Sequence, residues 1–152
     1  MADLTTVFLS FDAGADYALG ALGLAEDDGL ETAVLLSLFT DRRAEADDAL
    51  PGSDVDRRGW WGDAWPDIAG DRIGSRLWLL HREKQTPAVL GRAQQYAREA
   101  LAWMIDDGIA SGVDVVATIP RGGVLALEIG ITRPANPPIR YRFERFWSGD
   151  AV

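Results

Sequence analysis

The residues that could carry chemistry gather in one stretch, 40–76, which is rich in Asp, Arg, Gly and Trp. Loops with many oxygen ligands can bind Ca²⁺ or Mg²⁺. The run Asp54-Val55-Asp56 begins like a calcium loop, but Arg57 and Arg58 stand where a third oxygen ligand is required. Because these arginines can neutralise the carboxylates themselves, we predict a solvated or ion-paired loop and no metal ligand.

Acid–base catalysis is a second chemistry that paired carboxylates allow, as in glycoside hydrolases. It requires a fixed separation and an acid whose pKa is raised by an apolar pocket, and the sequence indicates neither. The single histidine, His81, has no Cys and no second His for a relay or a metal site, so we interpret it as a polar residue at the edge of an element. We predict no catalytic residue and no cofactor.

The tryptophans of this stretch are less easily assigned to ordinary surface. Trp60, Trp61 and Trp65 stand among Gly and Asp, beside arginines. Tryptophan and arginine are enriched at the energetic centres of protein interfaces. Alternatively, the indoles fold back and cover the core of the domain, each burying a large apolar area. The two interpretations are not exclusive, and both stay open.

Composition limits the classes of protein to consider. The 152 residues are 47% hydrophobic and 26% charged, which predicts one folded domain over 1–152. A net charge of −9 with scattered arginines disfavours nucleic-acid binding, and the absence of cysteine excludes disulfides. No signal sequence and no apolar stretch of membrane-spanning length is present, so we expect a protein made and kept in the cytoplasm, without membrane insertion.

Hydrophobic spacing predicts two main helices. The first covers 30–39, with Asp27 and Asp28 as candidate caps. The second starts at Thr86 as cap and Pro87 as first helical residue, and stops at Gly108. One apolar stripe is expected along it, made of Leu90, Ala93 or Gln94, Ala97, Leu101, Met104 and Ile105.

The C-terminal part predicts a three-stranded meander. Apolar residues alternate over 113–119 and again over 124–131, with the turn Pro-Arg-Gly-Gly between them, and a third strand follows over 139–147. A weaker alternation over 7–11 indicates a short strand or a docking arm within residues 1–25. We therefore predict an α+β fold, with two main helices packed on a small antiparallel C-terminal sheet and a long ordered Asp/Arg/Trp-rich loop.

Four segments in order carry a resemblance to a known family. They are LETAVLLSLFTDRRA at 30–44, DRRGWWGD at 56–63, GSRLWLLHREK at 74–84 and YAREALAWMIDDGIA at 96–110. With the meander, they resemble the small baseplate wedge protein of Mu-like contractile phages and prophages, over about 30–147. That family is distantly similar to the wedge proteins of larger tails that are named after lysozyme but are structural and help to start the sheath.

The distant relatives share two loop motifs with this chain and lack a third. Thr40-Asp41-Arg42-Arg43 matches the first motif and Gly74-Ser75-Arg76-Leu77 the second. Where those relatives carry Glu-Pro-Arg after the long helix, this chain has Asp106-Asp107-Gly108-Ile109. Contacts made through that arginine therefore do not transfer.

The resemblance implies a structural component of the virion tail baseplate, assembled in the bacterial host cytoplasm, and no enzyme. Its implied partners are other baseplate wedge proteins, with the tail sheath or tube as further candidates, and an exposed C-terminal strand is available to pair with a neighbour's strand. The alternative is a peptidoglycan-degrading or carbohydrate-binding tail protein that uses the Asp/Trp-rich loop. The hypothesised partner-binding residues are Arg42, Arg43, Arg57, Arg58, Trp60, Trp61, Asp63 and Arg76.

Overall fold

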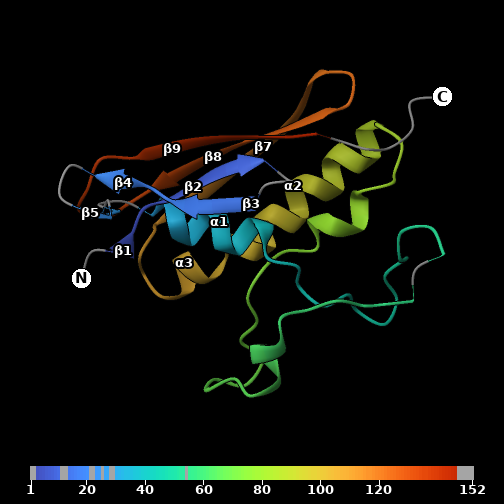
Figure 1. The fold of residues 1–152 in the computed structure, drawn as a ribbon, viewed down its shortest axis with the longest axis horizontal. Coiled ribbons are helices and arrows are strands. Elements are labelled where there is room, and N and C mark those ends of the chain that lie inside the picture. The colour runs from blue at the N-terminus through green and yellow to red at the C-terminus, as the bar shows by residue number, and fades with distance from the viewer. Residues whose placement is uncertain are drawn as a thin grey trace.

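The predicted C-terminal meander is present in the computed structural model, which describes residues 3–10, 14–20, 23–24, 26–27, 30–53 and 55–146. Strands β7 (Gly112–Arg121), β8 (Val124–Thr132) and β9 (Ile139–Phe146) form one antiparallel sheet in that order. Val115 lies opposite Ile129, which lies opposite Tyr141. Figure 1 shows this sheet nearly edge-on, with the helices on one of its faces.

The long predicted helix is confirmed at its start and divided near its end. In α2 (Pro87–Leu101) the Thr86 side chain accepts a hydrogen bond from the Val89 amide, and Pro87 begins the helix. A tightened turn at Ala102 then separates α2 from α3 (Trp103–Asp106), and Gly108 follows with a φ of +71°. Ile105, predicted to belong to the apolar stripe, is 47% exposed, whereas Met104 is fully buried.

Helix α1 (Glu31–Phe39) forms where predicted, but its predicted cap is wrong. Asp27 belongs to strand β6 (Glu26–Asp27), where it pairs with Asp3, and Asp28 lies outside the described residues. The N-cap residue is Leu30, whose side chain makes no capping hydrogen bond. Instead, the Leu30 amide donates to the Tyr141 hydroxyl on β9 over 3.1 Å, so a distant residue satisfies this end of the helix.

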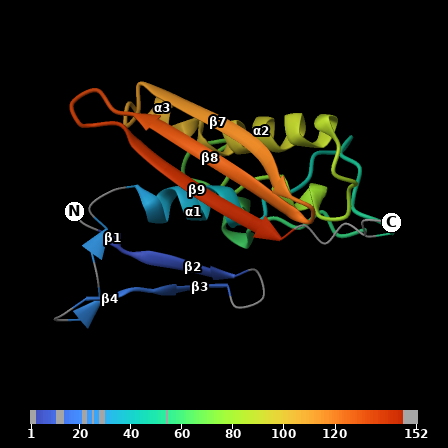
Figure 2. The same cartoon turned by 90° about the horizontal axis from the view of Figure 1, so that it is seen from above.

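The N-terminal residues form three two-stranded antiparallel pairs among the described positions. Their strands are β1 (Asp3–Leu4) with β6, β2 (Thr6–Ser10) with β3 (Gly14–Tyr17), and β4 (Leu19–Gly20) with β5 (Gly23–Leu24). The predicted strand over 7–11 thus agrees with β2, while Phe11 lies outside the described residues. The buried Thr32 hydroxyl of α1 donates to the Leu4 carbonyl and accepts from the Thr6 amide. This pair of bonds holds β2–β3 alongside α1 (Figure 2).

The core lies between the sheet and the helices. The expected face of β8 is buried, as are the inward positions of α1 and α2 and all four residues of the short 3₁₀ helix η2 (Leu77–Leu80). Gln94, left open as a stripe residue, instead donates to the Val115 carbonyl on β7, while Ala93 is fully buried. The α+β fold is therefore confirmed. Within the described residues, no helix has the length and apolarity needed to cross a membrane.

Candidate interaction site

The long loop between α1 and η2 is closed at its base by the two motifs singled out in the sequence. The Ser75 amide donates to the Thr40 carbonyl over 2.9 Å, and the Arg42 amide donates to the Ser75 carbonyl over 3.0 Å. The Ser75 hydroxyl donates to the Leu38 carbonyl at the end of α1. These bonds join residues far apart in the sequence, so the loop leaves the body and returns to it at a single point.

Gly74 is required for this closure. Its φ is +93°, and a Cβ at this position would lie 2.3 Å from the Thr40 carbonyl oxygen. Both the left-handed backbone and the close approach exclude other residues. The glycine at the start of the second motif is therefore required on steric grounds.

Arginines of the loop form ion pairs and hydrogen bonds with other residues of this chain, as the ion-paired interpretation predicted. The Arg58 guanidinium lies 2.8 Å from the Asp41 carboxylate and 4.5 Å from the centroid of the Trp78 ring. Trp78 is the buried indole of the core, and its Nε1 donates to the Arg42 carbonyl over 2.8 Å. Arg43 donates to the Arg58 carbonyl. Further bonds run from Arg57 to the Glu45 and Ala46 carbonyls, and an ion pair joins Arg72 to Glu45.

Arg76 is the centre of a partly buried charge network that links the loop to α2. Its guanidinium contacts Asp48 at 3.0 Å and Glu99 at 2.6 Å, and it stacks 4.6 Å from the centroid of the Tyr96 ring. The Arg76 side chain is 17% exposed and that of Asp48 11%. Burial alone would lower the pKa of Arg76, but Glu99 and Asp48 outweigh burial and raise it. The cation is thus held permanently charged between two carboxylates.

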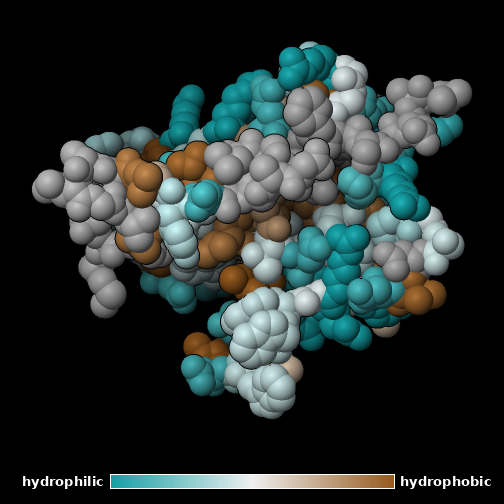
Figure 3. All heavy atoms as spheres, in the orientation of Figure 1, coloured by the Kyte–Doolittle hydropathy of each residue, from teal (hydrophilic) through white to brown (hydrophobic). Residues whose placement is uncertain are grey.

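The tryptophans of the loop stand outside the core. Trp60 precedes the 3₁₀ helix η1 (Trp61–Ala64) and is 45% exposed, whereas Trp61 and Trp65 are 75% and 78% exposed. The Trp60 and Trp61 rings lie 5.4 Å apart, and the Trp60 ring covers Gly62, where a Cβ would lie 2.1 Å from Cζ3. The interpretation that these indoles cover the core is therefore wrong. Figure 3 shows the part of the loop around η1 projecting from the body.

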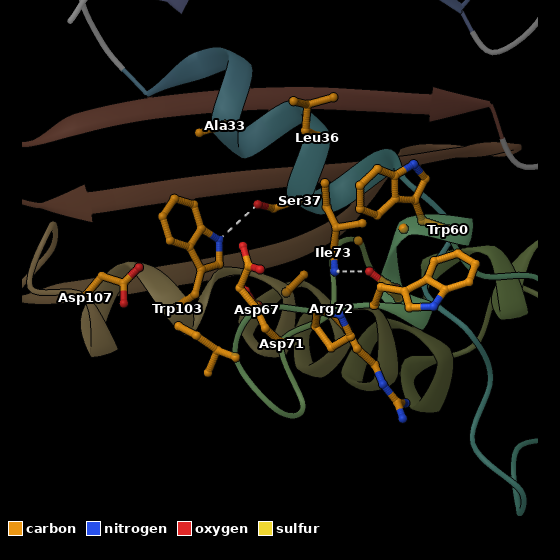
Figure 4. A pocket seen from close by; sticks show the side chains of 17 residues that line it. Ala33, Leu36, Ser37, Trp60, Asp67, Asp71, Arg72, Ile73, Trp103 and Asp107 are labelled. Carbon is orange, nitrogen blue, oxygen red and sulfur yellow. Dashed lines mark hydrogen bonds between the residues drawn. The ribbon is translucent and has the colours of Figure 1, made fainter.

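A groove of 690 Å³ separates this projection from the body. We call it the α1 groove and define it by Leu36 of α1, Trp103 of α3 and the loop residues Trp60, Trp65, Ile68, Asp63, Asp67, Asp71 and Arg72, with Asp107 after α3. Figure 4 shows Trp103 and Trp60 on opposite sides of it, with Asp67 between them in this view. The Trp103 Nε1 donates to the Ser37 hydroxyl, and the Ile73 amide donates to Asp63 Oδ1, which fixes two of the walls.

The structure divides the hypothesised partner-binding residues into three groups. Trp60, Trp61 and Asp63 lie at the projecting part of the loop. Arg43, Arg57 and Arg58 lie along its exposed stem, with half-buried Arg42 at the base. Arg76 belongs to the buried network behind it.

Sequence reasoning missed the opposite wall of the α1 groove. Leu36 and Trp103 were assigned to helices with no outward role, although the first helix is mainly apolar, with Glu31 as its only charged residue. That excess of apolar residues was the available signal, since a helix that is apolar around most of its surface is normally covered on more than one side. His81, by contrast, stands exposed at the end of η2, as interpreted. Among the described residues, no three His, Asp or Glu side chains are grouped so as to hold a metal ion.

Comparison with known proteins agrees with the resemblance drawn from the motifs. The family model "Phage protein GP46" matches residues 30–138. The chain belongs to the GP46 family. The match covers α1, the closed loop, α2 and most of the meander, which are the elements that build and hold the site.

Two GP46 relatives extend the match to nearly the whole chain. The baseplate protein gp46 of Escherichia phage Mu is 44% identical over 149 residues, which cover 98% of this chain and 99% of the relative. The Mu-like prophage FluMu protein gp46 of Haemophilus influenzae is 43% identical over 133 residues, with 88% and 90% covered. The predicted similarity to Mu-like phages and prophages is thereby confirmed.

Proposed function

We propose that this chain is a structural component of a Mu-type contractile tail baseplate and joins neighbouring wedge proteins through its closed loop. The phage Mu relative is a baseplate protein, which supports the first part, because the similarity covers both chains almost completely. The observation that carries the second part is the exposure of Trp60 and Trp61 on an anchored loop. Contiguous exposed apolar surface marks interaction sites, and the Trp60 and Trp61 rings lie 5.4 Å apart.

The loop is suited to binding because its shape is set before a partner arrives. Its base is closed by Thr40 and Ser75, and Arg58 holds its stem against the core residue Trp78. A preorganised segment loses less conformational entropy on association, so more of the contact energy appears as affinity. In this proposal Trp60 and Trp61 are the anchors, with Asp63 beside them.

The arginines of the hypothesised contact take two roles in this proposal. Arg42, Arg43, Arg57 and Arg58 offer charge along the stem, where complementary charges steer association. Arg76 supports the loop from behind through Asp48 and Glu99.

We place the assembled protein in the tail baseplate of the virion, after assembly in the host cytoplasm. The whole chain 1–152 acts in this proposal as one domain, with residues 1–25 as an additional docking arm. The tail sheath or tube is a further candidate partner. In that case β9 is the edge available for strand pairing, because Gln94 and Arg98 of α2 already donate to the Val115 carbonyl on β7.

The test is co-purification with the larger wedge protein of the same tail. We expect Trp60→Ala/Trp61→Ala to reduce capture at least tenfold, since truncating a central interface tryptophan removes about 2 kcal/mol or more. Val116→Ala, which truncates an exposed apolar side chain on β7 outside both the loop and the α1 groove, serves as the control. Gly62→Ala adds a variant that displaces the Trp60 ring without removing it. Unchanged capture by a double variant that is folded by circular dichroism would remove the proposed contact.

The alternative function is tested with the same parent protein and variants. A peptidoglycan-degrading or carbohydrate-binding protein would sediment with purified cell wall or release soluble fragments from it. Such activity, lost in the double tryptophan variant, would replace the assembly proposal.

A further inference from the structure

The α1 groove has an apolar wall that nothing in the described chain covers. Leu36 is 48% exposed on the largely apolar helix α1 and forms part of this wall. Trp103, Trp60 and Ile68 continue the wall around the groove. Trp103 is fixed in place by its bond to Ser37 (Figure 4). A preformed apolar recess with a helix on one side is the geometry that receives an apolar segment of another polypeptide.

The rim of the same groove is acidic. Asp67, Asp71 and Asp107 line it and form no ion pair with any described residue. The one cation of the lining, Arg72, is engaged with Glu45 at 3.3 Å. Asp63 uses Oδ1 to accept from Ile73, and its Oδ2 is buried with no hydrogen-bond donor among the described residues. Unpaired carboxylates around an apolar recess raise the local concentration of cationic partners.

We propose that the α1 groove binds an apolar segment of a partner polypeptide whose flanks carry Lys or Arg. The inference rests on the proposed assembly function and specifies the chemistry of one partner. The apolar side chains of the segment cover Leu36 and Trp103, and its flanking cations pair with Asp67 and Asp71. A second copy of this chain is a poor occupant, because two molecules with a net charge of −9 repel each other.

The groove overlaps the contact centred on Trp61 only in part. Trp60 and Asp63 belong to both, whereas Trp61 does not line the groove and Leu36 of α1 is not part of the contact. Variants at Leu36 and Trp61 therefore report on the two surfaces independently.

The first test measures binding of a defined probe to the full-length protein. The probe is a fluorescein-labelled amphipathic helical peptide of leucine and lysine, and its leucine–glutamate analogue is the charge control. We expect binding of the lysine peptide, measured by fluorescence anisotropy, to weaken about tenfold in Leu36→Gln, which corresponds to losing one good apolar contact. Val116→Gln is the matched control, because Val116 is 49% exposed, lies on β7 and is not in the groove. We expect it to bind within twofold of the parent.

Charge is tested by removing the same number of carboxylates at two places. Asp67→Asn/Asp71→Asn should weaken the lysine peptide several-fold and flatten its salt dependence, because screened ion pairs are lost. Asp47→Asn/Asp114→Asn removes the same charge from exposed positions outside the groove. Equal weakening by both pairs would mean attraction to the net charge alone and would overturn the proposal. So would equal binding of the glutamate peptide, or a dimer of the parent protein that Leu36→Gln dissociates.

Co-purification with the wedge protein separates failure of this inference from failure of the proposed function. Capture that is lost in Trp61→Ala but unchanged in Leu36→Gln and Asp67→Asn/Asp71→Asn would leave the assembly function and remove the groove from it. Capture unchanged in all of these folded variants would contradict both. Loss of capture in the groove variants, with normal capture by Val116→Gln, is the result we expect.

Discussion

The charge network around Arg76 gives the sharpest test of how the closed loop is held to the body. Arg76→Met keeps an aliphatic stem over the Tyr96 ring and removes the cation from between Asp48 and Glu99. Asp48, whose side chain is only 11% exposed, is then left without its partner. Removing one member of a buried ion pair costs about 3–5 kcal/mol. Glu99 is 38% exposed and adds little, so we expect a loss of about 3 kcal/mol.

The loss is measured by urea unfolding followed by circular dichroism, with thermal melts in parallel. For a chain of this length, 1 kcal/mol corresponds to about 2–4 °C in Tm, so the expected shift is about 6–12 °C. Arg92→Met is the matched control, because Arg92 of α2 also forms an ion pair, with Glu83, but both side chains are more than one-third exposed. That variant should lose less than about 1 kcal/mol.

Two further variants test whether the broken ion pair causes the loss of stability in Arg76→Met. Arg76→Lys should lose an intermediate amount, since an ammonium keeps the charge but cannot contact both carboxylates as a planar fork does. Asp48→Asn combined with Arg76→Met should cost less than the two single losses added together, because the pair is already broken. The reasoning fails if Arg76→Met and Arg92→Met are equally stable. Arg76 would then be free to serve a partner directly.

Three other outcomes follow from backbone and charge. Gly74→Ala should destabilise by at least about 3 kcal/mol in urea, whereas Gly70→Ala, which shares a positive φ but meets no atom, should cost about 1 kcal/mol; equal losses would exclude the Thr40 clash as the cause. Gly91→Ala, in α2 with open space around its Cβ, should raise stability by about 0.8–1 kcal/mol, and any loss would contradict this. Burial favours neutral Glu99, but hydrogen bonds from Arg76 and Gln95 outweigh burial and lower the pKa of Glu99. Its stabilisation is therefore present above about pH 4.5 and lost as pH falls through the folded pKa, so Glu99→Gln should lose less Tm than the parent on acidification, and identical slopes would refute this.

The fold was predictable wherever the pattern was local. Thr86 and Pro87 set the start of α2 through bonds within one turn, and alternation over 113–131 set the hairpin, because both signals depend on neighbouring residues only. The N-terminus of α1 was not predictable in this way. Its amide is satisfied by Tyr141, more than a hundred positions away in the sequence, and no local pattern reveals such a bond.

The candidate site was predictable in composition and not in arrangement. The tryptophans of the loop were recognised, but whether they cover the core depended on Trp78, which takes the core position instead. The arginines looked alike in sequence, yet Arg76 is buried between carboxylates while Arg43 lies exposed on the stem. The α1 groove needs α1, α3 and the loop together, and only the tertiary fold brings Leu36, Trp103 and Trp60 around one recess.

The single point at which the long loop leaves and re-enters the body has an evolutionary consequence. Because Thr40 and Ser75 are directly bonded, the projecting part around η1 can lengthen, shorten or change sequence without moving α1, η2 or the sheet, whereas Ala44, Asp48 and Arg58 are tied to the body. The entropic cost of a longer excursion grows only with the logarithm of its length. One scaffold can therefore present different projecting segments, provided that the loop residues packed on the core are kept.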